Sequence, residues 1–166
     1  MSARDAHDPP RTPPPEAPGE VVDSPDPSVA EHVRRYLATD GASGYHEGGA
    51  TNLVLTYRGR RSGAYYRTGL FFGRDADRYV LVASGSAVTH THPQWYLNVA
   101  AHPEVWAQIR GERFAARART ATGPERARLW ALMTELAPVY RAYAARSHRI
   151  IPVVILERLA PPAPAR

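Results

Sequence analysis

The stretch Gly59-Arg60-Arg61-Ser62-Gly63 lies between two apolar runs, residues 52–58 and 64–72, in a chain of 166 residues. Both runs have the length and the aromatic and β-branched content of strands, and the flanking glycines favour a tight turn between them. We therefore expect a β-hairpin whose tip carries two arginines and a serine. The rest of the predicted fold is built outward from this hairpin.

The arginine-rich tip suits an anion, because a guanidinium group meets phosphate or carboxylate through two parallel hydrogen bonds. Arg58 precedes the turn and Arg67 follows on the next strand, so four guanidinium groups fall within ten residues. Their mutual repulsion would be relieved by a ligand with several negative charges, such as a phosphodiester or an oligocarboxylate tail. A hairpin tip exposed to solvent explains the same pentapeptide, and both interpretations stay open at this point.

Four further runs have the length and boundaries of strands, and hairpin-length links join most neighbours along the chain. They are residues 78–84, 104–110, 113–120 and 150–156. Pro152 indicates that the last run is an edge strand or that a strand begins there. About six mostly antiparallel strands with few helices predict a mainly β (α+β) chain, in the form of a small barrel with peripheral helices.

The first expected helix begins near Ser28, which forms a capping-box pattern with Glu31. Apolar residues recur at helical spacing until Asp40-Gly41 ends the run. Its apolar face could pack on the core or lie on a membrane surface, and the sequence favours the core.

Three more helical segments are expected later in the chain. Residues 94–101 form a short one, and residues 139–148 supply another turn or two. Between them, Thr122 caps a longer helix that Pro124 opens and Pro138 ends.

The ends of the chain differ in composition from its middle. Residues 1–27 contain eight of the sixteen prolines and almost no large apolar side chain, so they cannot bury enough surface to offset the entropy of ordering. We expect a disordered Pro-rich acidic tail over residues 1–27, one domain over 28–159 and a disordered C-terminal tail over 160–166.

Charge is unevenly distributed: residues 1–30 carry a net charge of −4, whereas the remainder carries +9. A basic globule prefers anionic partners. We expect no nucleic-acid partner, because no helix carries a basic stripe and no nucleic-acid-binding motif occurs.

Several classes of function are excluded by what the chain lacks. Cysteine is absent, which removes disulfides, thiolate metal sites and cysteine nucleophiles. No apolar run approaches the roughly 18–20 residues of a membrane helix, and no secretory signal opens the chain, so we expect a cytoplasmic protein without stable membrane insertion. No order of Ser, His and Asp, paired-carboxylate site or nucleotide-binding glycine motif supports hydrolysis or a dinucleotide fold.

Residues 84–96 run from a strand end through a small-residue loop into a helix. Free backbone N–H groups in such a place can meet a phosphate or a ring carbonyl, although an ordinary loop has the same composition. His90 and His92 alternate as metal ligands sometimes do, but no carboxylate or third histidine completes a set, so we expect no metal. Trp95 and Tyr96 could form the wall of a planar-ring site or belong to the core.

Tyr140 and Tyr143 lie one helical turn apart and therefore share a face. Phenols at this spacing can donate hydrogen bonds to a carbonyl or nitro oxygen, or they can simply pack. With an ordinary pKa of about 10, a tyrosine is a poor base but a serviceable acid for a developing oxyanion. Asp75 and Asp77 are interpreted as a polar turn.

From about residue 36 to residue 156, about three quarters of its length, the chain resembles the deazaflavin-dependent nitroreductases, also known as coenzyme F420-dependent quinone reductases. Five stretches carry the resemblance, in the order of the family. They are Tyr-Leu-Ala-Thr-Asp-Gly at 36–41, Leu-Val-Leu-Thr leading into the arginine turn at 53–63, Asp-Arg-Tyr-Val-Leu-Val-Ala-Ser at 77–84, His-Pro-Gln-Trp-Tyr-Leu-Asn at 92–98 and Ile-Pro-Val-Val at 151–154.

The resemblance implies a split β-barrel whose groove holds coenzyme F420. It also implies an oxidoreductase that transfers hydride from the reduced cofactor to a quinone, a nitro-aromatic or an activated alkene. The cofactor-binding residues it implies are Arg60, Arg61, Ser62, Gly63, Arg67, Ser84, Ser86, His92, Trp95 and Tyr96. The catalytic residues it implies are Tyr140, Tyr143 and Ser84. The implied partners are a small-molecule substrate and, indirectly, the dehydrogenase that reduces F420; the chain itself would be a monomer or a homodimer.

The chain departs from the family pattern at several positions that bear on its substrate. Gly85 stands where Lys or Asn is frequent, Ala137 replaces the first of three spaced tyrosines, and Tyr65-Tyr66 replaces a common Pro-Arg pair. One alternative is therefore a family member that reduces or rearranges a single biosynthetic intermediate in natural-product tailoring. Another is a non-catalytic protein that binds F420.

Overall fold

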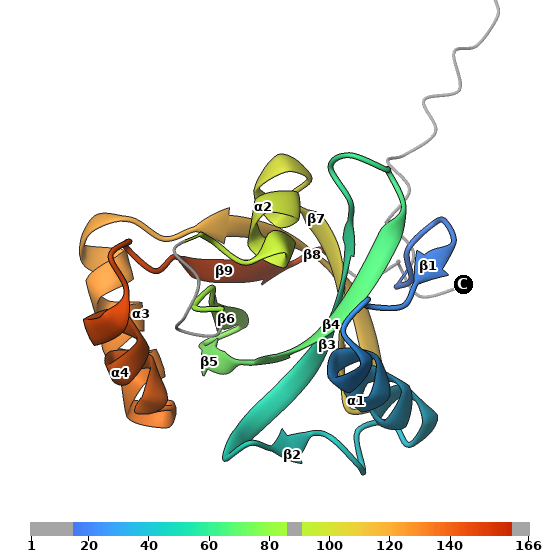
Figure 1. Ribbon diagram of the computed structural model, residues 1–166, viewed down its shortest axis with the longest axis horizontal. Coiled ribbons are helices and arrows are strands. Elements are labelled where there is room, and N and C mark those ends of the chain that lie inside the picture. The colour runs from blue at the N-terminus through green and yellow to red at the C-terminus, as the bar shows by residue number, and fades with distance from the viewer. Residues whose placement is uncertain (1–14, 86–90, 161–166) are drawn as a thin grey trace, which may run out of the picture.

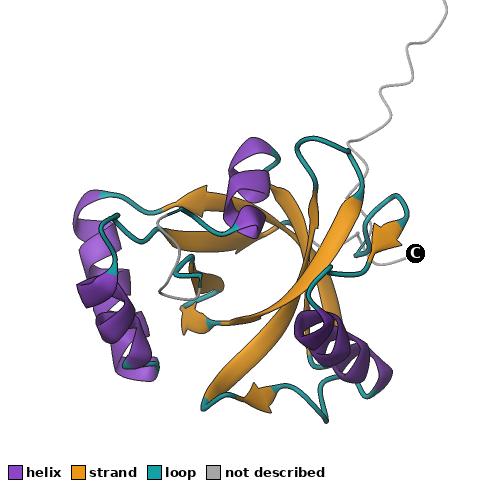
Figure 2. Cartoon of the chain, in the orientation of Figure 1, coloured by secondary structure: helices purple, strands orange, loops and turns teal. Residues whose placement is uncertain are grey.

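The computed structural model describes residues 15–85 and 91–160, which form nine strands and four helices (Figures 1 and 2). The strands are β1 (Val21–Val22), β2 (His46–Glu47), β3 (Ala50–Arg58), β4 (Tyr65–Phe71), β5 (Gly73–Asp75), β6 (Arg78–Val82), β7 (Glu104–Ile109), β8 (Glu112–Thr120) and β9 (Val153–Arg158). The helices are α1 (Pro27–Ala38), α2 (Gln94–Ala101), α3 (Gly123–Leu136) and α4 (Val139–Arg146). All six expected strands are present, and β1, β2 and β5 are short additions.

The described strands form one sheet in the order β1-β4-β3-β7-β8-β9-β6-β5, with β2 beside β3. Neighbours are antiparallel except β1 and β4, which are parallel. β4 and β5 lie near opposite ends of this order, yet only Phe72 separates them in the chain, so the sheet curls until its ends approach each other (Figure 1). The prediction of a mainly antiparallel split barrel is confirmed.

Side chains alternate between the two faces of each strand, so that one set points into the barrel. This inward set forms a buried apolar cluster. On β3, Leu53 and Leu55 are fully buried in the interior, whereas Val54 between them faces α1. Helix α2 adds Trp95 and Val99 to the same interior cluster. This packing places α2 beside the hairpin of β3 and β4, where the arginine turn lies.

Helices α3 and α4 cover the outer face of β6 and β9 (Figure 2). Val82 and Val153 point out of the barrel and meet Leu129, Met133 and Tyr140 of the two helices. A second apolar cluster therefore lies outside the barrel, and α4 is held by it.

Helix α1 uses its apolar face for packing, as the sequence favours. Val33 and Tyr36 are buried against Val54, and the Tyr36 hydroxyl donates a hydrogen bond to the Asn52 carbonyl at 3.0 Å. The alternative of a membrane-surface helix is thus not supported by this face.

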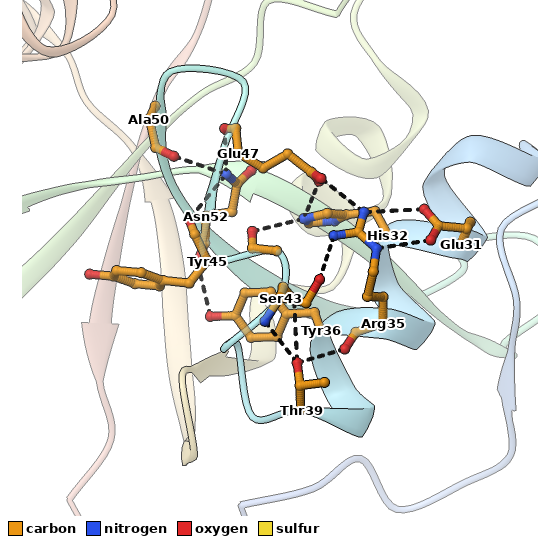
Figure 3. Close-up of polar contacts among 11 residues, drawn as sticks. Glu31, His32, Arg35, Tyr36, Thr39, Ser43, Tyr45, Glu47, Ala50 and Asn52 are labelled. Carbon is orange, nitrogen blue, oxygen red and sulfur yellow. Dashed lines mark hydrogen bonds and ion pairs between the residues drawn. The ribbon is translucent and has the colours of Figure 1, made fainter.

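The polar face of α1 is tied to β2 by a small charged network (Figure 3). Arg35 donates to Glu31 at 2.9 Å and to Glu47 at 2.8 Å, and His32 Nε2 lies 3.1 Å from Glu47. These contacts fix the loop that leads into β3.

The start of α1 differs from the expected capping box. The N-cap is Asp26, whose Oδ1 accepts from the Ser28 backbone N–H at 2.8 Å and from that of Val29 at 3.5 Å. Glu31 pairs with Arg35 instead of reaching back to the cap. The helix begins earlier because Pro27, with its fixed φ, suits the first helical position and needs no hydrogen bond there.

Part of the expected N-terminal tail takes up structure. Val21–Val22 pair with Tyr65-Tyr66 as β1, and Glu16 forms an ion pair with Arg113 at 2.5 Å. The sequence predicts disorder throughout residues 1–27. Val21–Val22 instead pair with β4 because the edge of that strand offers unpaired backbone groups, which the local composition of the tail does not reveal. Residues 1–14 and 161–166, also expected to be tails, lie outside the described residues.

The structure refines two further expectations, one for Pro152 and one for Thr122. β9 begins after Pro152 and pairs with both β6 and β8, so this proline marks a strand start and not an edge. Thr122 is the N-cap residue of α3, but its side chain makes no capping hydrogen bond.

Candidate functional site

The arginine turn connects β3 and β4 as a compact, hydrogen-bonded loop. The Gly59 N–H donates to the Ala64 carbonyl at 2.7 Å, and the Gly63 N–H donates to the Gly59 carbonyl at 3.0 Å. Gly63 has a φ of 73°, a left-handed conformation that glycine adopts without strain. The expected hairpin and its tight turn are confirmed.

Arg60 docks the turn on α2. Its backbone N–H and Nη1 both donate to Asn98 Oδ1, at 3.0 and 2.9 Å, and its Nη1 and Nη2 donate to Gln94 Oε1 at 3.1 Å. The partners are neutral amides, so they orient the guanidinium group without cancelling its charge. Because arginine has five N–H donors, two remain for a ligand.

Arg58 and Arg61 are exposed, and the side chain of neither makes a hydrogen bond or ion pair with another residue in the described part of the chain. Arg58 lies against the turn, since a Cβ atom built on Gly63 would be 3.6 Å from Arg58 Nη2. One fixed and two free cations therefore surround the hairpin tip.

A pocket of about 250 Å³ lies between the turn and α2. It is lined by Pro25, Tyr57, Gly59, Arg60, Arg61, Ser62, Tyr66, Gln94 and Asn98. Tyr57 and Tyr66 are opposite each other on β3 and β4, and their rings stack with centroids 6.1 Å apart. The pocket thus combines an aromatic wall with a cationic rim.

The two tyrosines and Ser62 also supply hydroxyl groups to this pocket. Ser62 Oγ accepts from the Ala64 N–H at 3.2 Å and lies 3.1 Å from the Tyr66 hydroxyl. Burial, with a smaller contribution from Tyr66, raises the pKa of Tyr57. The phenol of Tyr57 therefore stays protonated at neutral pH.

Arg67 is not part of this pocket. It pairs with Thr56 in the register of the hairpin, one residue from Tyr66, and so points to the opposite face of the sheet. There it lines a separate cavity of about 230 Å³ with Trp106 and Arg113. The expectation that Arg67 joins the turn is wrong, because strand residues one apart face opposite sides.

The described residues on either side of the strand-end loop are joined by a residue that we did not expect, Arg149, in the connection between α4 and β9. Its Nη2 donates to the Ser84 carbonyl at 2.6 Å, and its Nη1 donates to the Ala83 carbonyl at 3.2 Å and to His92 Nδ1 at 2.9 Å. Burial, and then the charge of Arg149, lower the pKa of His92. Ser84 is buried, and Ser86 lies outside the described residues.

Trp95 and Tyr96 separate in the structure. Trp95 is buried in the barrel core, which is the second of the two roles left open by the sequence. Tyr96 is partly buried, its hydroxyl lies 2.8 Å from Thr120 Oγ1, and its ring meets the edge of His92 at a centroid distance of 5.1 Å. Neither ring lines the pocket at the arginine turn.

Tyr140 and Tyr143 share a face of α4, as expected, with ring centroids 6.4 Å apart. Tyr140 is only 4% exposed and packs against Phe71, and burial raises its pKa further above the ordinary value. Tyr143 is partly exposed at the edge of the same cluster. The structure therefore makes Tyr140 a packing residue and leaves Tyr143 as the accessible phenol.

Comparison with known proteins identifies the relationship. The sequence profile of the F420H(2)-dependent quinone reductase family matches residues 28–158. The chain belongs to this family. An F420H(2)-dependent quinone reductase of Mycobacterium tuberculosis is 35% identical over 131 residues, which span 76% of this chain and 87% of that protein.

Solved structures agree with the family assignment. An F420-H2 dependent reductase (FDR-A) is 34% identical with a TM-score of 0.60, covering 64% of this chain and 93% of that one. A structure described as a domain-swapped dimer is 31% identical with a TM-score of 0.63, covering 76% and 92% of the two chains. As a member of the F420H(2)-dependent quinone reductase family, the chain is an oxidoreductase whose reductant is reduced coenzyme F420.

Several residues of this family member's site were missed from sequence: Tyr57, Tyr66, Gln94, Asn98 and Arg149. The hairpin register offered a signal for the tyrosine pair, because residues equally far from a turn lie opposite each other. Gln94 and Asn98 are four residues apart on one helix face, which could have indicated an amide pair for a cation. Arg149 offered no local signal, because its partners are more than fifty residues away.

Metal-binding clusters and membrane-spanning helices are both absent from the described residues of this family member. Over residues 15–85 and 91–160, no group of three or more His, Asp or Glu side chains is placed to hold a metal ion. Within the same ranges, no helix has the length and apolar character needed to cross a membrane.

Proposed function

We propose that this chain transfers a hydride from reduced coenzyme F420 to a quinone, with the cofactor's anionic tail bound at the pocket between the arginine turn and α2. The observation that carries the proposal is Arg60, a cation held in place by Gln94 and Asn98 with two N–H donors left over. Membership of the F420H(2)-dependent quinone reductase family supplies the identity of the reductant.

The residues fit the group that the family implies. A phosphodiester and oligoglutamyl tail needs several cations within reach: Arg60 and Arg61 line the pocket, and Arg58 lies near Gly63 at the same turn, although on β3 it alternates with the pocket residue Tyr57. Their charges are not cancelled by any carboxylate in the described part of the chain. The stacked rings of Tyr57 and Tyr66 supply an apolar wall beside them. When bound, the reduced deazaflavin supplies the hydride.

The remaining proposed roles divide between the strand-end loop and α4. Ser84 and His92 would bind the cofactor beside the arginine turn. His92 lies two residues before α2, the helix whose Gln94 and Asn98 hold Arg60. We place Tyr143 as the proton donor to the reduced acceptor, since it is the accessible phenol of α4 and an ordinary tyrosine is a competent acid for an oxyanion.

The proposed reaction consumes reduced cofactor, so a separate dehydrogenase has to regenerate it. We infer an indirect partnership of this kind, in which the cofactor diffuses between the two proteins. The oligomeric state stays a prediction, and light scattering on the purified chain distinguishes a monomer from a homodimer.

The decisive experiment titrates the full chain with oxidised F420 and follows the cofactor's fluorescence, then measures oxidation of reduced F420 in the presence of menadione. We expect saturable binding, turnover, and a rise in Kd of about tenfold or more when Arg60→Ala and Arg61→Ala are combined. Arg141→Ala, at an exposed arginine of α4, is the matched control. Absence of binding contradicts the proposal, and binding without reduction of any quinone replaces it with a cofactor carrier.

A further inference from the structure

Arg149 is a half-buried cation that lies among hydrogen-bond acceptors and not among carboxylates. Its guanidinium group contacts the carbonyls of Ala83 and Ser84 and the ring of His92. No Asp or Glu within residues 15–85 and 91–160 forms an ion pair with it, and its Nε has no hydrogen-bond partner there. Partial burial without a carboxylate lowers the pKa of Arg149, and the buried Nε–H without a partner costs free energy, so stability alone does not account for this arginine.

The backbone around Arg149 is itself held in place. Ser147 Oγ accepts from the Arg149 N–H at 3.2 Å and donates to the Arg149 carbonyl at 3.2 Å. On the other side, the Ala83 N–H donates to the Pro152 carbonyl at 2.9 Å. The guanidinium group therefore meets His92 from a fixed position and not from a free loop.

The contact with His92 decides where the imidazole carries its proton. A guanidinium group has only N–H donors and no acceptor. His92 Nδ1, at 2.9 Å from Arg149 Nη1, must therefore offer its lone pair. A neutral imidazole with an unprotonated Nδ1 carries its proton on Nε2, and a charged imidazolium, with N–H on both nitrogens, is incompatible with this contact.

We propose that Arg149 is a positioning residue that keeps His92 neutral and protonated on Nε2, so that His92 presents a permanent hydrogen-bond donor to an oxygen of the bound cofactor. The inference rests on the proposed function and deepens it. Under this proposal His92 binds the cofactor and is not the donor of the proton that the reduced acceptor takes up. A neutral imidazole has one ring N–H and lacks the second N–H that a charged imidazolium could give up. The proton donor is then left to the accessible phenol of α4.

The lowered pKa of His92 agrees with this arrangement. Its largest cause is burial and its second is the charge of Arg149, and both favour the neutral ring. The ring of Tyr96 meets His92 edge-on at a centroid distance of 5.1 Å. Tyr96 restrains the plane of the imidazole, while Arg149 selects the tautomer.

The first test needs no cofactor. Nitrogen NMR of the uniformly labelled full chain distinguishes protonated from unprotonated imidazole nitrogens, and His92→Gln assigns the signals among the seven histidines. In the wild type we expect an unprotonated Nδ1 and a protonated Nε2 at neutral pH. A protonated Nδ1, or a charged ring at pH 7, overturns the proposal even if no variant can be made.

Variants then separate positioning from folding. Arg149→Met is expected to mix the two tautomers and to raise the pKa of His92 toward the ordinary histidine value, whereas Arg149→Lys, which keeps a donor, restores the Nε2-protonated form at least in part. Arg141→Met is the matched control and should leave the His92 signals in place. A folded Arg149→Met protein with unchanged His92 signals overturns the proposal.

The second test adds oxidised F420. We expect the His92 Nε2 signal to move on saturation, and Kd to rise about tenfold in Arg149→Met and in His92→Phe, with little further rise when the two are combined. If F420 binds without moving the His92 signals, the further inference is wrong while the proposed function stands. If F420 does not bind at all, the proposed function is wrong, and the tautomer experiment is unaffected.

Discussion

The arginine turn and helix α4 each carry a pair of like side chains, and in both regions the structure treats the two members differently. In the turn, Arg60 is bonded to α2, whereas Arg61 is exposed. On α4, Tyr140 is buried against Phe71, whereas Tyr143 is partly exposed. One member of each pair is fixed by protein contacts, and the other is exposed at least in part.

The comparison shows that residue type and spacing identify candidate site residues, whereas contacts with the neighbouring helix or sheet determine the role of each one. Arg60 differs from Arg61 because amide acceptors on α2 reach one side of the turn. Tyr140 differs from Tyr143 because the outer face of the sheet covers one side of α4. Mutations within each pair can therefore separate a loss of architecture from a loss of binding.

The largest effect is expected at Tyr140. Tyr140→Ala removes a buried ring between α4 and β4 and should lower the free energy of unfolding by about 3–5 kcal/mol. Tyr143→Ala should cost much less because its ring is partly exposed. Urea unfolding of both variants checks the ranking, and equal losses would contradict the division of roles on α4.

The contact between Arg60 and Asn98 should rank second. Each single substitution to alanine breaks the bond from Arg60 Nη1 to Asn98 Oδ1, so their effects on F420 affinity should not add fully, and the coupling should be about 1–2 kcal/mol. Binding titrations of Arg60→Ala, Asn98→Ala and the double variant measure it. Fully additive effects would show that Arg60 contributes to F420 affinity independently of Asn98.

A smaller effect is expected for Arg61→Ala. This side chain is exposed and forms no hydrogen bond or ion pair in the described part of the chain, so its loss should leave unfolding unchanged and raise the Kd for F420 by about three- to tenfold. The difference from wild type should shrink as salt is added, because exposed charges are screened. A salt-independent difference would rule out the electrostatic explanation.

The smallest effect concerns the ion pairs that link α3 to the sheet. Hydrogen bonds from Arg128 and then Arg78 lower the pKa of Asp75, and Arg119 and then Arg78 lower the pKa of Glu125 to about 2. The ordinary values are 3.8 and 4.5, so the unfolded chain binds more protons between these and the folded values. The stabilisation is present above about pH 4.5 and is lost as the pH falls toward 2.

Unfolding measured from pH 6 to pH 2 checks this prediction. Asp75→Asn should reduce the slope of stability against pH in the acid range, whereas Asp77→Asn, at an exposed aspartate of the same turn, should not. Equal slopes in the two variants would exclude Asp75 as a source of the pH dependence. The turn at residues 75–77, which the sequence indicated only as polar, is thus also an anchor for α3.

The sequence by itself determined the strand pattern, the hairpin and the family. The arginine turn, the apolar runs on either side of it and the ordered motifs are local or short-range features that can be recognised without knowledge of distant contacts. Arg60, Arg61 and Ser62 were therefore found from sequence and lie together at one pocket. The short strand β1 was missed, because pairing with the edge of β4 depends on a partner more than forty residues away.

Only the tertiary structure decided which candidates share a place and which way each side chain faces. The hairpin register sends Arg67 to the opposite face from Tyr66, and the outer cluster buries Tyr140. The return of the chain from α4 to β9 brings Arg149 to His92. These outcomes depend on contacts between segments far apart in the chain, whose positions are set by the closure of the barrel and not by neighbouring residues.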